Sequence, residues 1–348
     1  MDRKKIAWSV ISVALAALSV WAVSAQCRAF SLDLFISHIT SASPLWIAFA
    51  VLAMLGFIFF EAKALLCITR SFGYRRSLAD GFAWSASDIY FSAITPSATG
   101  GQPACAYFMV RDGVPGVTSA VALLANLAMY TLSIIVIGAV SLLAFPSVFA
   151  SFSHLSRVLI VIGFAVQVAL LSFFVLLLNH ETLCRRIVCG AISLGAKLKI
   201  VRRREKLMSK AEKWMDDYHE HSAMLRGRTG MMIRVLLWNI AQRASQIAVT
   251  SLVYLAMFGA DGGDMLTSAL RIFAMQSLVV IGANMIPIPG AMGVTDFLML
   301  DVYGSFLPEE SATSLELISR SLSFYVCIVI CIAALAAKIL IMKRRQKQ

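Results

Sequence analysis

Long runs of apolar residues, rather than short alternating ones, set the pattern of this chain. A helix rises about 1.5 Å per residue and needs about 20 apolar residues to cross the hydrocarbon core of a bilayer. Runs of this kind occupy 6–26, 44–68, 78–110, 114–145, 155–178, 231–258, 266–307 and 317–342. Two of them, 78–110 and 266–307, are interrupted by proline and glycine. The pattern predicts an all-α polytopic membrane protein with about six full transmembrane helices and two broken or re-entrant helical hairpins.

The first apolar run, 6–26, follows a basic start and ends near small residues, as a signal peptide does. A signal peptide, however, has an apolar region of only about 7–15 residues. Because this run is longer and many further spans follow it, we expect an uncleaved first helix that starts on the cytoplasmic side.

Composition agrees with a membrane protein. Hydrophobic residues make up 59% of the chain and charged residues 14%, whereas about 25% of a soluble domain is charged. The chain therefore has too little polar surface to face water all round. The seven cysteines have no framework spacing and lie mostly in or beside apolar runs, so we expect packing residues and no disulfide set.

Charge is distributed unevenly between the connecting segments. Most of the 31 lysines and arginines fall before residue 6, in 70–76, at Arg111, in 185–234 and after 337. The alternate segments hold few basic residues and an excess of acidic ones, including Asp261, Asp264, Glu309 and Glu310. The positive-inside rule then predicts a multi-pass protein of the cell membrane with cytoplasmic N- and C-termini. It also explains the net charge of +12, so we expect no nucleic acid partner.

The charge bias holds only if each interrupted run returns to the side from which it entered. A hairpin that dips partway into the membrane and one that spans it twice both return to the same side, so charge does not distinguish them. The short halves of the interrupted runs favour re-entrant hairpins. Residues 44–145 then form a unit in the order span, hairpin, span. Residues 231–342 form a second unit in the same order, which runs through the membrane in the opposite direction. We expect these units to form an inverted repeat within a single membrane domain, 1–348, as in many transporters whose broken helices bind substrate near the midplane.

The first interruption, TPSATGGQP, runs from Thr95 to Pro103. Proline lacks a backbone N–H, and Gly100 and Gly101 permit positive φ, so the helix is expected to stop and a new one to run from Pro103 to Val110. The free backbone N–H groups of the new helix favour an anion. The polar side chains expected to join them in a pocket at membrane depth are Thr95, Ser97, Thr99 and Gln102.

The second interruption, IPIPGAMGVTD, is expected to act in the same way for a helix that starts near Gly290. Its helix-breaking residues are Pro287, Pro289, Gly290 and Gly293. Both interruptions could instead be structural loops without a ligand. We favour binding, because polar breaks at this depth are costly to maintain.

Charged residues also fall inside the apolar runs, where a charge at the bilayer centre costs at least ~2.5 kcal/mol. We expect Arg271 to hold a lipid phosphate and Asp296 to balance a charge beside it. For the remaining charged residues we expect ion pairs between helices or snorkelling to the interface. These are Glu61, Lys63, Asp88, Arg243, Asp301 and Arg320.

The largest hydrophilic piece is the basic amphipathic segment 181–230, expected in the cytosol. Within it, apolar residues recur at helical spacing at Leu207, Ala211, Trp214, Tyr218 and Leu225. One interpretation is a helix that lies on anionic inner-leaflet lipids through residues 200–225, and the other is a solvated loop that sets orientation. The histidines near Glu220 form no metal-ligand pattern, so we expect neither a metal nor another cofactor.

The two interruptions also carry a family resemblance, through TPSATGGQPACAYFMVRDGV and MIPIPGAMGVTD. They resemble the lysylphosphatidylglycerol synthetase transmembrane-region family, which includes the flippase half of the multiple peptide resistance factors and stand-alone flippase-like proteins. The resemblance covers essentially the whole chain and implies a lipid-translocating fold. It implies roles for Thr95, Pro96, Gly100, Gly101, Pro103, Tyr107, Pro287, Pro289, Gly290 and Gly293. The chain departs from the family at Ala291, often glycine, and at Asp296, often a longer glutamate.

Together these features predict a flippase-like transporter that translocates a phospholipid or polyprenyl-phosphate headgroup. Two alternatives remain open. One is the membrane part of a phosphatidylglycerol lysyltransferase system, and the other is a proton-coupled small-solute transporter that uses Asp88 or Asp296. The longest soluble stretch has about 50 residues, below the usual size of a domain that folds alone. We therefore expect no catalysis by this chain, with a separate lipid-modifying enzyme as a candidate partner beside membrane phospholipids.

Overall fold

All regular structure in the described part of the chain is helical. The structure, a computed structural model, describes residues 32–95, 99–197, 204–259, 264–284 and 293–345. The predicted first span, 6–26, lies outside these ranges. The helices are α2 (Leu32–Ser41), α3 (Pro44–Ser71), α4 (Leu78–Ile94), α5 (Gly101–Arg111), α6 (Gly116–Ala144), α7 (Pro146–Ser151), α8 (His154–Asn179), α9 (Glu181–Lys197), α10 (Arg204–Ala223), α11 (Thr229–Phe258), α12 (Met265–Ala283), α13 (Val294–Tyr303), α14 (Glu309–Arg320), the π-helical segment η3 (Ser321–Val326) and α15 (Cys327–Arg345).

Five helical segments of the described residues are long and apolar enough to cross a membrane. They are α3, α6, α8, α12 and the continuous segment Glu309–Met342, which joins α14, η3 and α15. The prediction of an all-α polytopic membrane protein is therefore confirmed. α11 has 30 residues and carries buried polar side chains, including Asn239, Gln242 and Arg243.

Both predicted interruptions separate two helices, α4 from α5 and α12 from α13. α5 has 11 residues and α13 has 10. At 1.5 Å per residue each is roughly 15–17 Å long, too short for a hydrocarbon core of about 30 Å. These lengths favour hairpins with one arm that enters only partway. α12, however, has the length and composition of a full span.

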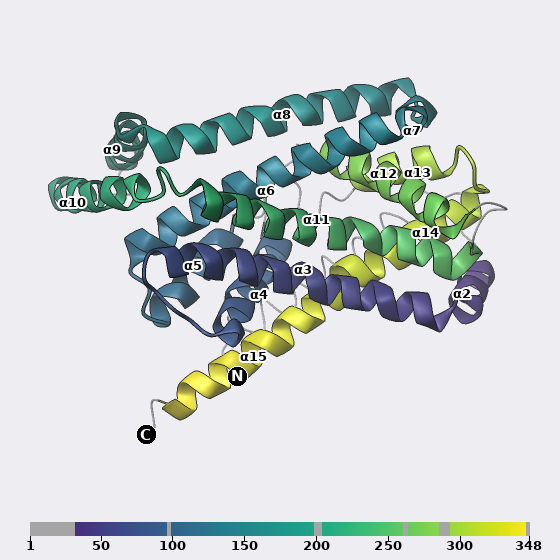
Figure 1. The fold of residues 1–348 in the computed structure, drawn as a ribbon, viewed down its shortest axis with the longest axis horizontal. Coiled ribbons are helices and arrows are strands. Elements are labelled where there is room, and N and C mark those ends of the chain that lie inside the picture. Colours follow the sequence, from purple (N-terminus) through teal and green to yellow (C-terminus); the bar gives the residue numbers. More distant parts are fainter. Residues whose placement is uncertain (1–31, 96–98, 198–203, 260–263, 285–292, 346–348) are drawn as a thin grey trace.

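Four long helices, α3, α6, α8 and α11, run along the long axis of the molecule (Figure 1). α9 and α10 lie at one end of this axis, and α2 and α7 lie at the other. The α4–α5 hairpin lies in the half nearer α9 and α10, and the α12–α13 hairpin in the half nearer α2 and α7. The two hairpins therefore approach the centre from opposite ends.

Contacts at the α9–α10 end agree with the prediction that the basic segments share one side. Arg228 donates a hydrogen bond to the carbonyl oxygen of Ser71. The rings of Phe72 and His221 lie 5.9 Å apart, centroid to centroid. The loop after α3 and the segment after α10 are thus neighbours at this end.

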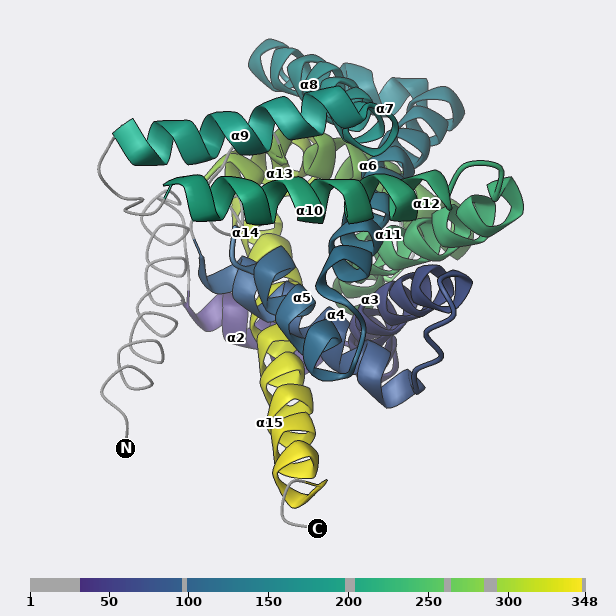
Figure 2. The same cartoon turned by 90° about the vertical axis from the view of Figure 1, so that its left-hand side faces the viewer.

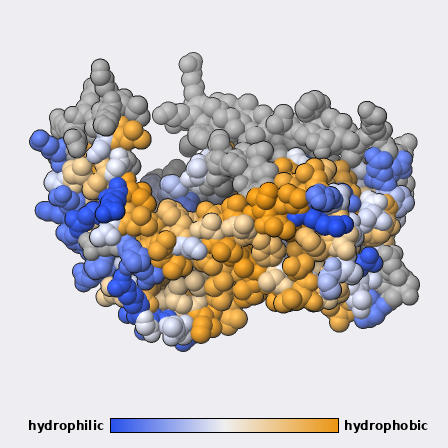
Figure 3. All heavy atoms as spheres, turned by 90° about the horizontal axis from the view of Figure 1, so that it is seen from above, coloured by the Kyte–Doolittle hydropathy of each residue, from blue (hydrophilic) through white to orange (hydrophobic). Residues whose placement is uncertain are grey.

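An apolar belt crosses the middle of one face of the molecule. Figure 3 shows hydrophobic residues across the centre of one face and hydrophilic residues toward its two ends. α8 supplies much of the exposed apolar surface, through Leu155, Val158, Val161, Ile162, Val168, Leu170, Phe173, Val175 and Leu176. An exposed apolar surface of this extent is typical of contact with lipid.

Small residues let helices approach closely inside this belt, as is common between transmembrane helices. A Cβ atom at Gly163 of α8 would lie 2.3 Å from the carbonyl oxygen of Ile281 in α12. A Cβ atom at Gly138 of α6 would lie 2.0 Å from the side chain of the same isoleucine. The two glycines therefore bring α6 and α8 against α12, the long arm of the second hairpin.

The predicted amphipathic stripe of α10 is partly a protein core. α10 packs on α9 and on the ends of α6 and α8, as the end view in Figure 2 illustrates for α9. Tyr218 and Leu225 are buried, and the Tyr218 hydroxyl donates to the carbonyl oxygen of Leu177 at 3.2 Å. Leu207 and Trp214 remain exposed. Binding of residues 200–225 to anionic lipid stays a prediction, now with less apolar surface to support it.

Candidate functional site

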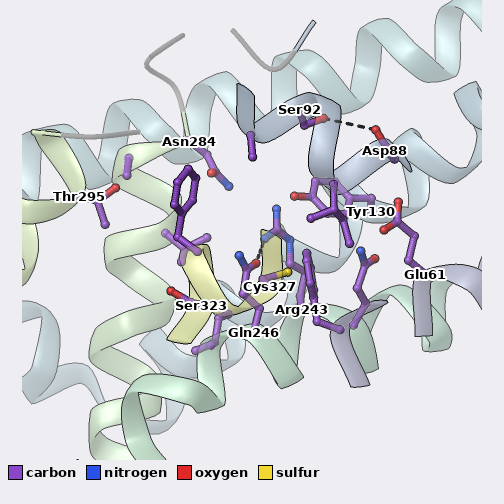
Figure 4. A pocket seen from close by; sticks show the side chains of 18 of the residues that line it. Glu61, Asp88, Ser92, Tyr130, Arg243, Gln246, Asn284, Thr295, Ser323 and Cys327 are labelled. Atoms are coloured by element: carbon purple, nitrogen blue, oxygen red, sulfur yellow. Dashed lines mark hydrogen bonds between the residues drawn. The ribbon is translucent and has the colours of Figure 1, made fainter. Parts of the chain in front are cut away.

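A cavity of about 780 Å³ lies between the two broken hairpins, beside the middle of α11 (Figure 4). The first hairpin contributes Asp88, Ser92 and Gln102, and the second contributes Gln276 and Thr295. The other polar residues of the wall come from α3, α6, α11, the end of α12, α14 and η3. They are Glu61, Asn126, Tyr130, Gln242, Arg243, Gln246, Thr250, Asn284, Ser319, Arg320 and Ser323. The cavity thus brings polar side chains from both hairpins together among apolar ones.

Two carboxyl groups stand together in one wall. Glu61 of α3 accepts a hydrogen bond from the Ser85 hydroxyl at 2.7 Å. Asp88 of α4 accepts from the Gln102 amide at 2.8 Å and from the Ser92 hydroxyl at 3.3 Å. Glu61 and Asp88 are neighbours in the cavity wall (Figure 4). Gln102 thereby ties the start of α5 to α4 across the first interruption.

Arg243 lies near the middle of α11 and is only 5% exposed. Its guanidinium carbon lies 4.0 Å from the centroid of the Tyr130 ring, and the group donates a hydrogen bond to Gln246. Among the described residues, no carboxylate oxygen lies within 4 Å of an Arg243 nitrogen, so Arg243 forms no ion pair there. Stacking on Tyr130 therefore fixes the orientation of a cation that has no ion-pair partner within 4 Å among the described residues.

Buried polar atoms without partners belong to residues of the same cavity wall. Nε of Arg243, Oε1 of Gln242 and Oγ of Ser319 have no hydrogen-bond partner among the described protein atoms. All three residues line the cavity. Because an unmade hydrogen bond in a buried site is costly, these atoms point to water or a polar ligand in the cavity.

Arg320 also lines the cavity but is already paired. Its guanidinium contacts the carboxylate of Asp296 and donates to Oε1 of Glu316 at 3.0 Å. Asp296 also accepts the backbone N–H of Gly293 at 2.9 Å, which caps the start of α13. This ion-pair cluster attaches the second hairpin to α14.

At the first interruption, the structure brings Gln102 into the cavity but not every predicted residue. The Thr95 hydroxyl is used locally, since it accepts from the Gly100 N–H at 2.9 Å and donates to the Phe91 carbonyl oxygen at 2.6 Å. Thr99 is exposed and does not line the cavity. Tyr107 is 54% exposed and accepts a hydrogen bond from Arg111 at 2.9 Å, also away from the cavity. Ser97 lies outside the described residues.

The glycines of this interruption provide space rather than positive φ, so the prediction of positive φ there is wrong. Gly100 has φ −81°, and Gly101 is already in the first turn of α5. A Cβ atom at Gly101 would lie 2.1 Å from Oδ1 of Asp88. The new helix also begins at Gly101 instead of Pro103, because proline is tolerated anywhere in a first turn that lacks helical N–H partners.

At the second interruption, Gly293 does adopt positive φ, +85°, as expected of a helix-breaking glycine. The helix expected from Gly290 begins later, at Val294. Pro287, Pro289 and Gly290 lie outside the described residues. The structure does not bring Arg271 to the cavity: its guanidinium is exposed and stacks over the Phe306 ring at 5.5 Å. Asp296 is buried but pairs with Arg320 rather than Arg271.

The sequence interpretation assigned Arg243 and Glu61 to structural roles, whereas both line the cavity. A signal for α11 was present in the sequence. Polar residues occur there at the i, i+3, i+4, i+7 and i+11 positions of one helix, at Asn239, Gln242, Arg243, Gln246 and Thr250. This spacing puts them on one helical face, which is uncommon in a lipid-facing span.

Comparison with known proteins agrees with this architecture. No match was found among curated proteins. A family model described as the lysylphosphatidylglycerol synthase transmembrane region matches residues 9–331, nearly the whole chain, and the chain belongs to that family.

Proposed function

We propose that this protein is a flippase-like transporter that moves the phosphate-bearing headgroup of a lipid across the membrane. The lipid is a phospholipid or a polyprenyl phosphate, which share this chemistry. One observation carries the proposal: Arg243 lies in a cavity between two broken hairpins, lined by polar and apolar side chains, and forms no ion pair among the described residues. A guanidinium in that state suits an anionic phosphate oxygen.

The cavity also borders the surface that would face lipid. Leu170 of α8 lines the cavity and is 37% exposed, on a helix that supplies much of the exposed apolar surface. A headgroup at Arg243 can therefore lie inside the protein while its acyl or prenyl chains stay in the bilayer beside α8. This division suits an amphiphilic lipid better than a small solute.

The proposal includes an orientation and a mechanism of access. The basic α9–α10 end faces the cytoplasm of the cell, and the units 44–145 and 231–342 act as an inverted repeat whose hairpins open the cavity to alternate sides. Any chemical modification of the lipid is assigned to a separate lipid-modifying enzyme. The family description is compatible with such a partner.

Lipid movement tests the proposal directly. Purified protein is reconstituted into phosphatidylcholine vesicles with a trace of fluorescent phosphatidylglycerol, and dithionite quenching follows transfer between leaflets. We expect transfer well above protein-free vesicles. Arg243→Gln removes a charged hydrogen bond worth about 1.5–3 kcal/mol, which corresponds to roughly 10- to 150-fold slower transfer.

Arg234→Gln is the matched control, because Arg234 is an exposed arginine on the same helix that does not line the cavity. It should transfer lipid at the wild-type rate. Reconstitution yield and elution volume are compared for all three proteins. Equal rates in Arg243→Gln and Arg234→Gln, or a wild type no faster than empty vesicles, would refute the proposal.

A further inference from the structure

The carboxyl pair in the cavity wall is not explained by binding of a phosphate, which would repel it. Glu61 is 4% exposed and Asp88 is 8% exposed, and they come from different helices. They line the same cavity wall (Figure 4), and neither has an ion-pair partner within 4 Å among the described residues. Two buried carboxylates without a paired cation are costly in the charged form, and a proton on one of them removes the repulsion between them. The geometry is therefore that of a pair that holds a proton.

The charged and titratable groups around the pair come from several helices. Arg243 of α11 is close enough to attract Glu61, and Tyr130 of α6 lies under the Arg243 guanidinium. The thiol of Cys105 on α5 is near enough to interact electrostatically with both carboxyl groups, and that of Cys331 on α15 with Glu61. Two further cations are turned elsewhere: Lys63 to the Phe59 and Trp238 rings, and Arg320 to its own two carboxylates.

Independent observations point to a ligand in the same cavity. Nε of Arg243 and Oε1 of Gln242 are buried and have no hydrogen-bond partner among the described protein atoms. Gln242 is 2% exposed and lines the cavity. A ligand with oxygen acceptors would satisfy the guanidinium in the same cavity that the carboxyl pair lines.

Charge balance links this ligand to the proton. In the empty cavity, a pair that holds one proton carries one negative charge, which Arg243 balances. A phosphodiester brings one further negative charge into a site where unpaired charge is costly. Uptake of a second proton by the pair restores neutrality, without any change to the covalent bonds of the lipid.

We propose that Glu61 and Asp88 are the proton-binding site of the transporter, and that one proton enters with each lipid phosphodiester and leaves with it. The proton moves between water and a carboxylate oxygen, and the lipid moves between Arg243 and the opposite leaflet. This inference rests on the proposed function and adds its energy source, a pH gradient. Transport is electroneutral.

Steady-state lipid distribution tests the coupling. Vesicles with trace fluorescent phosphatidylglycerol are given a gradient of one pH unit, and potassium with valinomycin clamps the voltage at zero. Since one pH unit is worth 1.36 kcal/mol, coupling of one proton per lipid shifts the leaflet ratio by about tenfold toward the alkaline side. In Glu61→Gln and Asp88→Asn, which keep the side-chain shape, the ratio should not respond to the gradient.

Proton uptake gives a second measurement that does not need a transporting variant. Calorimetric titration of short-chain phosphatidylglycerol into detergent-solubilised wild type, in two buffers of different ionisation enthalpy, should report uptake of about one proton per bound lipid. Glu61→Gln should report none.

The outcomes separate the two proposals. Wild type that transfers lipid but ignores the pH gradient and takes up no proton overturns the coupling and leaves the flippase function standing. A response to a sodium gradient in place of the pH gradient also overturns it. Wild type that neither transfers nor binds phosphatidylglycerol overturns both proposals.

Discussion

The two broken hairpins are held by opposite halves of one helical segment, and by different kinds of ion cluster. Arg320, at the end of α14, contacts Asp296 of the second hairpin and Glu316. Lys338 of α15 contacts two acids at the base of the first hairpin: Asp80, at 2.5 Å, and Asp112, at 2.7 Å. The two clusters lie on either side of η3, whose residues Ser323 and Phe324 line the cavity.

The clusters differ in their access to water. The side chains of Asp296 and Glu316 are 1% and 0% exposed, whereas those of Asp80 and Asp112 are 22% and 11% exposed. Buried ion pairs lose several kcal/mol when one partner is removed, while pairs in contact with water are worth little. The difference indicates that the first hairpin is the easier one to release, and that the second is the more rigid border of the cavity.

Removal of the Arg320 charge should have the largest effect. Arg320→Met leaves two buried carboxylates without a cation, so we expect a loss of about 3–5 kcal/mol in the free energy of unfolding. The measurement is denaturant unfolding in detergent. The triple variant Arg320→Met, Asp296→Asn, Glu316→Gln should recover most of the loss. A loss below about 1 kcal/mol in the single variant would show that the clusters do not differ in this way.

Removal of the Lys338 charge should cost less, about 1–2 kcal/mol after screening by solvent, and the loss should shrink in high salt. Partial burial acts to raise the pKa of Asp80, but hydrogen bonds from Lys338 and Ser77 outweigh it and hold that pKa below its usual value. The stabilisation is therefore present at neutral pH and is lost as pH falls below about 4, through the lowered pKa. Urea unfolding of Lys338→Met across pH and salt measures both effects.

Lys213→Met is the control for this experiment, because Lys213 is exposed on α10 and makes no ion pair among the described residues. It should change neither the stability nor its salt dependence. A loss from Lys338→Met that equals that from Arg320→Met would contradict the comparison of the two clusters.

A change within η3 should affect stability least and sharpen the comparison most. Deletion of Leu322 removes the extra residue that a π-helical turn accommodates, so the segment can continue as an α-helix with both clusters in register. We expect stability within about 1 kcal/mol of wild type. Lipid transfer should slow, since Ser323 and Phe324 move relative to the cavity. Unchanged transfer would mean that the π-helical turn takes no part in transport.

Much of the architecture could be predicted from local sequence. The spans follow from the length of apolar runs, and the interruptions after Ile94 and before Val294 follow from proline and glycine, because each of these signals is contained in a short stretch of chain. Gly101 was expected to provide positive φ, but it is needed because a Cβ atom there would collide with Asp88. The local sequence does not reveal such a contact between helices.

The sequence by itself determined that this chain is a helical membrane protein with two broken hairpins, and it identified the family. It could not decide which of several intramembrane arginines faces a ligand. In the sequence, Arg243, Arg271 and Arg320 are each a single arginine within an apolar run. They differ in the side chains that contact their guanidinium groups. Only the tertiary structure decided that Arg320 is ion-paired, that Arg271 lies outside the cavity and that Arg243 lines it. The reason is that ion pairing depends on distances between helices far apart in the chain.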